Sequence, residues 1–345
     1  MTFAQLTFRD SLRDTIDCLA ARADAHYHMG FRGPIRRSTL ADANETRDWR
    51  IYATLAEQLI RRARQMYVGE PLAADLEATV YALDSTTIDL CLTLFPWARF
   101  RRTKAAIKLH TLLDLRGPIP SFVHISDGRL HDLNFLDELL IEPGAFYVMD
   151  RGYLDFRRLS LLQQQGAFFV IRAKHGFRYA RIHSLAVDPD QGVRSDQIIR
   201  LDDFRSLKDY PDRLRRIRFL DKDTGCFFVY LTNNFSLPAL TITRLYKSRW
   251  QIELFFRWIK QNLRIKHFFG TSPNAVKTQV WIAVCVYVLV AILKKQLNLQ
   301  ESLHKIIQVL SVNAFEKVPL QELLMKTESP TTSYIKYNQL MLFDL

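Results

Sequence analysis

The sequence has few cysteines and no histidine pair spaced to bind zinc from one helix. The cysteines, four in all and without a CxxC pair, are Cys18, Cys91, Cys226 and Cys285. We interpret the histidines nearest the motifs below as structural, and these are His110, His124 and His131. The first residues, MTFAQLTFRDSLRD, contain charges and no apolar core, so no secretory signal is visible. These absences exclude a disulfide framework and a structural zinc site, and they favour a reducing cytoplasm.

Long apolar runs, internal repeats and low-complexity segments are also missing. The most apolar stretch, Val280 to Leu293, is flanked by Lys277, Lys294 and Lys295. It is shorter than the roughly 20 residues that span a bilayer, so we predict a buried core helix. With 345 residues, 48% of them hydrophobic, the chain can bury one large core or two to three smaller ones.

Acidic residues are too few to balance the basic ones. Asp and Glu number 36 against 48 Lys and Arg, which gives a net charge of +12. Such an excess attracts polyanions, so nucleic acid is the first partner to consider. Charge alone does not decide the matter, because many proteins are basic without binding nucleic acid.

Patterning along the chain divides it into regions of different type. Residues 1–75 have helical spacing and suit either a DNA-binding or dimerisation region or a helical support for the next domain. Residues 76–173 and 236–300 alternate short β-type runs with helices, which predicts a mixed α/β core. Residues 174–235 predict a β-rich insertion, and residues 301–345 a C-terminal helical tail.

Two aspartates follow apolar β-type runs. Asp84 comes after VYAL and Asp150 after FYVM, and we predict that both close strands. A strand end is a rigid platform for carboxylates, which are the ligands that Mg²⁺ prefers. A turn or capping residue is the plainer interpretation of each Asp alone. Asp89 and Asp155 compete with them, but neither follows such a run.

A third acid lies in the segment LYKSRWQIELFFRWIKQNL. On one helix Tyr246, Arg249, Glu253 and Lys260 would fall within about 60° of one another. The adjacent apolar face would hold Leu245, Ile252, Phe255, Phe256, Ile259 and Leu263. An amphipathic helix with ordinary Glu and Arg pairs on its solvated side is the alternative. A Glu among Arg, Lys and Tyr also suits a metal ligand surrounded by groups that bind phosphate.

These residues resemble a known family. The order Tyr246, Arg249, Glu253, Lys260 resembles the signature of the insertion sequence 4 family of DDE transposases, without a departure in spacing. YALDSTTIDL around Asp84, FYVMDRGYLDF around Asp150 and the later LTNN resemble other blocks of that family. The resemblance runs from about residue 3 to about residue 325.

The resemblance implies a fold and an activity. The fold would be α/β, an RNase H-like mixed sheet core with a β-rich insertion, flanked by an N-terminal helical domain and C-terminal helices. Asp84, Asp150 and Glu253 would be catalytic and hold two Mg²⁺ ions, which Mn²⁺ could replace. Tyr246, Arg249 and Lys260 would bind phosphates at the transposon end.

Members of this family act as dimers on terminal inverted repeats. They cut both strands through a hairpin at the transposon end and join the 3′-hydroxyls to target DNA. We therefore expect a cut-and-paste DNA transposase that binds double-stranded DNA as a homodimer. The alternatives are a truncated, non-catalytic derivative that binds DNA ends, and an RNase H-like nuclease or recombinase acting on other nucleic acid.

The chain departs from its relatives in two places. Its N-terminal region is shorter than usual, so part of an end-binding or dimerising region is expected to be missing. Some relatives stack a flipped base on a Trp of the insertion, but no Trp lies between Asp150 and Trp250. The aromatic residues that could serve instead, or simply belong to core strands, are Phe168, Phe227, Phe228 and Tyr230.

Clusters of basic residues support DNA contact without specifying it. One cluster follows the first acid and comprises Arg99, Arg101, Arg102, Lys104 and Lys108. Another lies in the insertion and comprises Arg213, Arg215, Arg216 and Arg218. Either could be a solvated face. From the first cluster we select Arg101, Arg102 and Lys104 as predicted DNA-binding residues.

Overall fold

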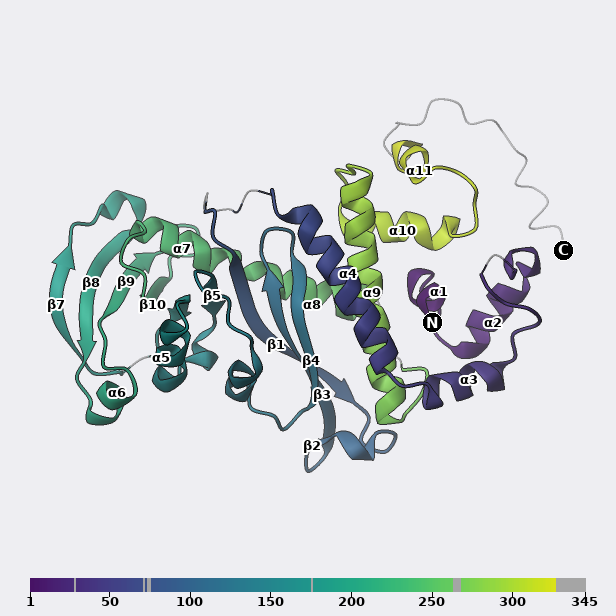
Figure 1. Ribbon diagram of the computed structural model, residues 1–345, viewed down its shortest axis with the longest axis horizontal. Helices are drawn as coiled ribbons and strands as arrows, with labels where there is room; N and C mark the ends of the chain where they lie inside the picture. Colours follow the sequence, from purple (N-terminus) through teal and green to yellow (C-terminus); the bar gives the residue numbers. More distant parts are fainter. Residues whose placement is uncertain (28, 71, 73–75, 175, 263–267, 327–345) are drawn as a thin grey trace.

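The computed structural model describes residues 1–27, 29–70, 72, 76–174, 176–262 and 268–326. A twisted sheet occupies one end and the centre of the molecule, and helices fill the other end (Figure 1). Helix α4 (Arg50–Tyr67) and helix α9 (Pro273–Gln296) pack against each other between these parts. The N-terminal helices and the last helices of the described chain lie beyond them.

All the described strands join one sheet. They are β1 (Val80–Leu90), β2 (Arg99–Arg101), β3 (Lys104–Asp114), β4 (Ile119–Asp127), β5 (Phe146–Met149), β6 (Phe168–Arg172), β7 (Tyr179–Leu185), β8 (Val193–Leu201), β9 (Leu214–Leu220) and β10 (Phe227–Thr232). Their order is β2-β3-β1-β5-β6-β10-β9-β8-β7, and β4 also pairs with β3.

The centre of this sheet is the predicted RNase H-like core. Across β4-β3-β1-β5-β6, the first three strands are antiparallel to their neighbours, whereas β1, β5 and β6 run parallel. The connection from β5 to β6 contains α5 (Phe156–Gln164), as expected for a crossover between parallel strands. The prediction of a mixed α/β core is therefore confirmed.

Residues 174–235 contribute the antiparallel strands β7 to β10 and the short helix α6 (Phe204–Asp209). Because β10 pairs with β6, these strands extend the core sheet without a break. A buried arginine pairs with an aspartate inside this segment and also bonds the loop that follows it. Arg215 binds Asp196 at 2.9 and 2.7 Å and donates to the carbonyl of Leu237 at 2.5 Å.

The two faces of the sheet are covered differently. One face packs against α4, α7 (Ala239–Ser248), α8 (Trp250–Asn262) and α9, and the other packs against α5, α6 and the 3₁₀ helix η3 (Asp132–Glu138). Alternate residues of β1 follow this division, because Val80 and Ala82 point to the first face and Tyr81 and Leu83 to the second. The segment 130–140, whose sequence pattern predicts a helix, forms only the shorter 3₁₀ helix η3.

The remaining helices lie away from the sheet. They are α1 (Thr2–Leu6), α2 (Leu12–Ala20), α3 (Arg37–Thr46), α10 (Leu303–Asn313) and α11 (Leu320–Lys326), with short 3₁₀ turns at Ala23–Ala25, Pro96–Ala98, Arg151–Tyr153 and Pro189–Gln191. The end of the predicted C-terminal tail, residues 327–345, lies outside the described residues. The division of the chain into domains stays a prediction.

Helix α9 contains the apolar stretch of the sequence. It begins at Pro273, after the Ser272 hydroxyl caps the amide of Ala275 at 3.1 Å. Among the described helices it alone is long and apolar enough to cross a membrane, but 83% of its most apolar window is buried within the protein. The predicted core helix is confirmed, and it is longer than the apolar run because polar residues extend both ends.

Candidate active site

Asp84 and Asp150 lie side by side on neighbouring strands. The parallel strands β1 and β5 are paired in register from Val80 and Phe146 to Leu83 and Met149. The next residue of each strand is one of the two aspartates. Because both follow the same alternation, both side chains are directed to the face that α8 covers.

Asp150 follows β5 directly, as predicted, but Asp84 does not end its strand. β1 continues to Leu90, because its antiparallel pairing with β3 extends from Asp84 and Thr111 to Leu90 and Ala105. The expectation that Asp84 closes a strand is therefore wrong. Asp84 instead lies where β1 loses its parallel neighbour β5, and its carboxylate lies on the face that α8 covers.

Backbone amides orient both carboxylates. The amide of Ser85 donates to Asp84 Oδ1 at 2.8 Å, and the amide of Arg151 donates to Asp150 Oδ1 at 2.6 Å. Asp150 also caps the 3₁₀ turn Arg151–Tyr153. In each aspartate the backbone thus holds one oxygen, Oδ1.

The helical segment that carries Glu253 is interrupted. Instead of one predicted helix, α7 ends at Ser248 and α8 begins at Trp250, with tight i to i+3 bonds on both sides of Arg249. Tyr246 therefore lies on α7, whereas Glu253 and Lys260 lie on α8, so the expectation of one continuous helix is wrong. The predicted apolar face is buried at Leu245, Ile252, Phe255, Phe256 and Ile259, and Leu263 lies outside the described residues.

Arg249 joins the first and third acids. Its guanidinium donates to Asp84 Oδ2 at 2.9 Å and to Glu253 Oε1 at 2.5 Å. Its side chain is 15% exposed, and its Nε is buried without a partner among the described atoms. The sequence suggested that Arg249 would face a DNA phosphate. In the structure its guanidinium instead binds the two carboxylates.

Burial and like charges act together on Asp84. Desolvation raises the pKa of its carboxyl to about 6, and Asp150 and Glu253 add to this rise. The amide of Ser85 and the guanidinium of Arg249 oppose it without cancelling it. A carboxylate that is costly to ionise next to two others is a site where a cation binds favourably.

Two tyrosines border the acids, and burial raises the pKa of each, so both hydroxyls stay neutral. Tyr246 packs on Tyr230 with ring centroids 4.6 Å apart, and Arg249 lies over its ring at 5.8 Å. Tyr153 is buried on the other face of the sheet. The sequence did not single out Tyr153, although its place three residues after Asp150 was the available signal.

The carboxylates have the donor chemistry of a site for a hard divalent cation. Among the described residues, however, no three His, Cys, Asp or Glu side chains stand close enough to hold one ion together. The Arg249 guanidinium occupies the space between Asp84 and Glu253. The carboxylates therefore fit a divalent cation by their chemistry. Cation binding between Asp84 and Glu253 requires the Arg249 side chain to move first.

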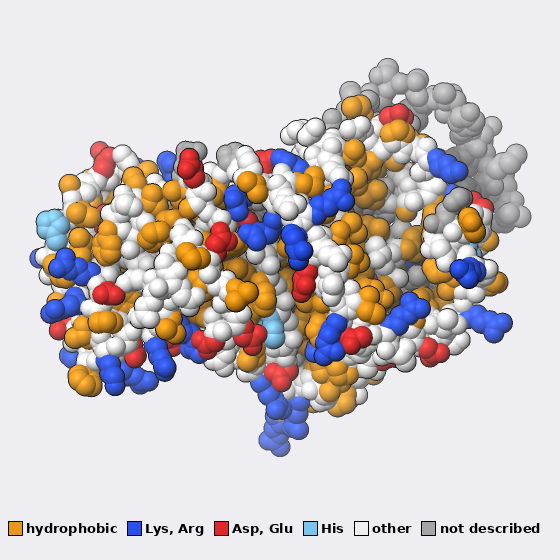
Figure 2. Space-filling view, in the orientation of Figure 1, with side chains coloured by type: hydrophobic (Ala, Val, Ile, Leu, Met, Phe, Trp, Pro, Cys, Tyr) orange, Lys and Arg blue, Asp and Glu red, His pale blue; other side chains and the backbone are white. Residues whose placement is uncertain are grey.

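Four members of the predicted basic cluster, Arg99, Arg101, Arg102 and Lys104, form a narrow projection, whereas Lys108 is 14% exposed and pairs with Asp132. Arg101 pairs with Lys104, so Arg102 and Thr103 form a two-residue turn, and all four side chains are exposed. Figure 2 shows Lys and Arg side chains projecting from the lower edge of the molecule, where Figure 1 places β2. We call residues 99–104 the basic finger. Within the described part of the chain, no acidic group pairs with its side chains.

The aromatic residues predicted as alternatives for base stacking differ in exposure. Tyr230 is 1% exposed, and Phe168 stacks on Phe146 with centroids 4.9 Å apart, so both belong to the core. Phe228 is half-buried, stacks on Tyr230 and lies under Arg172 at 4.9 Å. Phe227 is 51% exposed, and it projects from the opposite face of β10.

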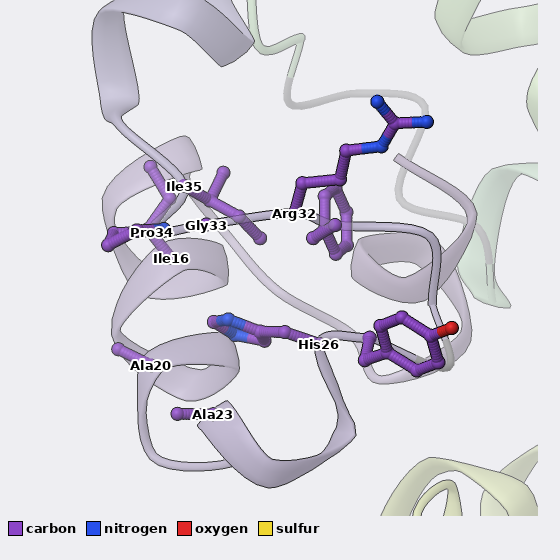
Figure 3. A pocket seen from close by; sticks show the side chains of 10 residues that line it. Ile16, Ala20, Ala23, His26, Arg32, Gly33, Pro34 and Ile35 are labelled. Atoms are coloured by element: carbon purple, nitrogen blue, oxygen red, sulfur yellow. The ribbon is translucent and has the colours of Figure 1, made fainter.

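An apolar pocket lies far from the acids. It measures about 480 Å³ and lies among the N-terminal helices, beyond α4 and α9 from the sheet (Figures 1 and 3). Figure 3 shows His26, Arg32 and small apolar side chains of α2 around it. The His26 ring bonds the carbonyl of Leu19 at 2.8 Å, and no carboxylate lines the pocket. It offers no catalytic chemistry.

Two segments of the chain match known protein families. Residues 75–289 match the transposase DDE domain, and this segment contains all three acids. The chain belongs to the DDE transposase family. Residues 1–32 match a separate domain of unknown function, DUF4372. Membership of this family implies an enzyme that cuts and joins DNA strands during transposition, so the predicted family is confirmed.

Relatives named as transposases support this assignment. A Sinorhizobium fredii protein named as a transposase, y4zB, is 35% identical over 73% of this chain and 70% of its own length. A protein of Geobacillus stearothermophilus named for the insertion sequence element IS5377 is 34% identical over 64% of this chain and 59% of its own. One of Synechocystis named for the element IS4SA is 23% identical, over 74% and 71%.

A solved structure resembles the transposase at a distance. The piggyBac transposase in a synaptic complex with hairpin DNA superposes with a TM-score of 0.41. It is 11% identical and matches 74% of this chain and 55% of that one.

Proposed function

We propose that the transposase moves its own element by a cut-and-paste reaction, acting as a dimer on terminal inverted repeats. It cleaves strands at the element's ends and joins the 3′-hydroxyls to target DNA. One observation carries the proposal. Asp84 and Asp150 are adjacent in register, and Glu253 is linked to Asp84 through Arg249. Three acids from distant parts of the chain thus converge on one face of the sheet.

Asp84, Asp150 and Glu253 would hold Mg²⁺ or Mn²⁺. When bound, the ions would supply Lewis acidity for phosphoryl transfer. The protein's own contribution is to gather the carboxylates against their mutual repulsion. The amides of Ser85 and Arg151 fix two of them on the sheet, and α8 supplies the third from above.

Arg249 would exchange carboxylates for phosphate. It now neutralises Asp84 and Glu253, and a cation bound there would take over that role. The released guanidinium could then form a bidentate pair with a DNA phosphate nearby. Tyr246, beside Arg249, and Lys260, farther along α8, would bind the same backbone.

The basic finger would bind the duplex away from the scissile phosphate. Thr111, the partner of Asp84, lies eight residue steps along β3 from Thr103 in the turn. At about 3.4 Å per residue they span about 27 Å, or about 8 base pairs of B-DNA. Hydroxyl-radical footprinting should show protection within about 8 base pairs of the cut. Replacing Arg101, Arg102 and Lys104 by Ala should remove that protection while leaving the fold intact.

The proposal is tested with purified protein and duplex DNA carrying the element's ends. Strand cleavage should require Mg²⁺ or Mn²⁺, and Asp84→Ala, Asp150→Ala and Glu253→Ala should each abolish it. End binding, measured by gel shift, should persist in all three variants. Unchanged cleavage in the variants contradicts the assigned acids. End binding by the wild type without cleavage instead supports a DNA-binding derivative.

A further inference from the structure

A chain of hydrogen bonds lies behind Asp84, on the face of the sheet opposite α8. Ser85 Oγ donates to Asp132 Oδ1 at 2.7 Å, and the Ser85 amide donates to Asp84 Oδ1 at 2.8 Å. Lys108 Nζ donates to the same Asp132 oxygen at 3.1 Å and to the carbonyl of Leu130 at 2.9 Å. Ser85 therefore connects a polar cluster on one face with a catalytic acid on the other.

This connection lies where β1 loses one of its two neighbouring strands. β5 pairs with β1 only as far as Leu83 and Met149. From Asp84 onward β1 has a strand partner on one edge alone, which is β3. The Ser85–Asp132 bond supplies a lateral restraint from η3 at the second residue beyond that pairing, directly after Asp84. Without this bond, the backbone of β1 beyond Leu83 is paired with β3 alone among the described strands.

The helix that provides Asp132 is itself fixed to the sheet. His110 stands opposite Ser85 in β3, is fully buried, and stacks on Phe135 of η3 with centroids 5.0 Å apart. Burial lowers the pKa of His110 to about 4, so its ring is neutral near pH 7. Lys108, which is 14% exposed, then supplies the positive charge beside Asp132. The cluster is anchored by packing on one side and by an ion pair on the other.

We infer that Asp132 and Ser85 position the Asp84 carboxylate for divalent cation binding. This inference rests on the proposed function. Both act through the backbone of β1 and do not touch the ion or the DNA. Groups that orient metal ligands in this way typically change metal affinity by about 10- to 100-fold when removed. Sequence alone gave no signal for Asp132, which lies 47 residues from Ser85.

Mn²⁺ binding to the full chain, followed by isothermal titration calorimetry, tests the inference directly. Ser85→Ala removes one hydroxyl and keeps the amide that binds Asp84, and it should weaken Mn²⁺ binding about 10-fold. Asp132→Asn should weaken it to a similar degree. The Mn²⁺ affinity of the double variant should be no lower than that of the single variant with the lower affinity, because both changes interrupt one connection.

Two matched controls separate positioning from general damage. Asp137→Asn removes another acid of η3, which is paired with Arg158 at 2.6 Å and has no bond to β1. Ser160→Ala removes a buried hydroxyl of α5. Both should bind Mn²⁺ as the wild type does. Cleavage by Ser85→Ala should return to the wild-type rate at saturating Mn²⁺, because only the affinity is altered.

The outcomes distinguish the inference from the function on which it rests. Wild-type Mn²⁺ binding that disappears in Asp84→Ala but is unchanged in Ser85→Ala and Asp132→Asn overturns the inference alone. Equal weakening in Asp137→Asn also overturns it, because the effect would then be general. A wild-type protein that binds no Mn²⁺ contradicts the proposed function itself.

Discussion

Replacing the Asp84 carboxylate by an amide is expected to stabilise the fold near neutral pH. The folded protein raises the pKa of Asp84 from 3.8 to about 6, chiefly by burial and further by Asp150 and Glu253. Ionising this group therefore costs more in the folded state than in the unfolded chain. Asp84→Asn keeps the shape and removes that cost, so the active-site charge should trade stability for function.

The magnitude follows from the shift. A difference of about 2 pKa units between the folded and unfolded states corresponds to about 3 kcal/mol of unfolding free energy. The wild type loses nearly all of this stability above pH 6, where Asp84 is ionised. A raised folded pKa stabilises the protein only while the group is protonated, and that contribution is lost as the pH rises from about 4 to 6. The free energy of unfolding of Asp84→Asn should therefore be higher than that of the wild type by about 3 kcal/mol at pH 8 and by about 1 kcal/mol at pH 4.5.

Urea unfolding at pH 8 and pH 4.5, with EDTA present, measures this difference. Added Mg²⁺ should stabilise the wild type and so reduce the difference in unfolding free energy between the two proteins at pH 8. Asp137→Asn is the control of opposite sign, because hydrogen bonds from Arg158 lower the pKa of Asp137. That variant should lose stability at pH 8 and recover it as the pH falls. If Asp84→Asn is less stable than the wild type at pH 8, or if the difference in unfolding free energy does not change with pH, then folding does not raise the pKa of Asp84.

Three further changes test the structure by urea or thermal unfolding. Asp196→Ala leaves the buried Arg215 guanidinium unpaired and should cost about 3 to 5 kcal/mol, so an effect below 1 kcal/mol contradicts the buried pair. Gly192→Ala forces a side chain onto a residue with φ of +87°, where its Cβ would lie 2.7 Å from a carbonyl oxygen, and should lower Tm measurably. Asn233→Ala removes bonds to two backbone groups at the start of β6 and should cost about 1 to 3 kcal/mol; an unchanged Tm would contradict that role.

Local patterns predicted the strands and the core helix because those elements bury residues close in sequence. The runs before Asp84 and Asp150 form β1 and β5, and Val280 to Leu293 lies inside α9. The extension of one sheet through residues 174–235 was not predictable, since it depends on β10 pairing with β6, about 60 residues earlier in the chain. Strand pairing between distant segments leaves no periodic trace in either one.

The residues of the candidate site could be proposed from the sequence, but their arrangement could not. Glu253 lies near Asp84 as the resemblance implies, but the break at Arg249 has no Gly or Pro to announce it. Arg249 bonds Asp84 across 165 residues of sequence. Such a contact is decided by tertiary packing, so the helical spacing of Tyr246 and Lys260 gave no indication of it.

The proposed function requires the three acids to act together in cutting DNA. Single-turnover cleavage of end-bearing duplex by Glu253→Gln is a direct measurement of this, because the change removes one charge and preserves size. With Mg²⁺ saturating and end binding matched to the wild type, we expect the cleavage rate to fall by at least about 1,000-fold. Cleavage by Glu253→Gln at the wild-type rate would contradict it.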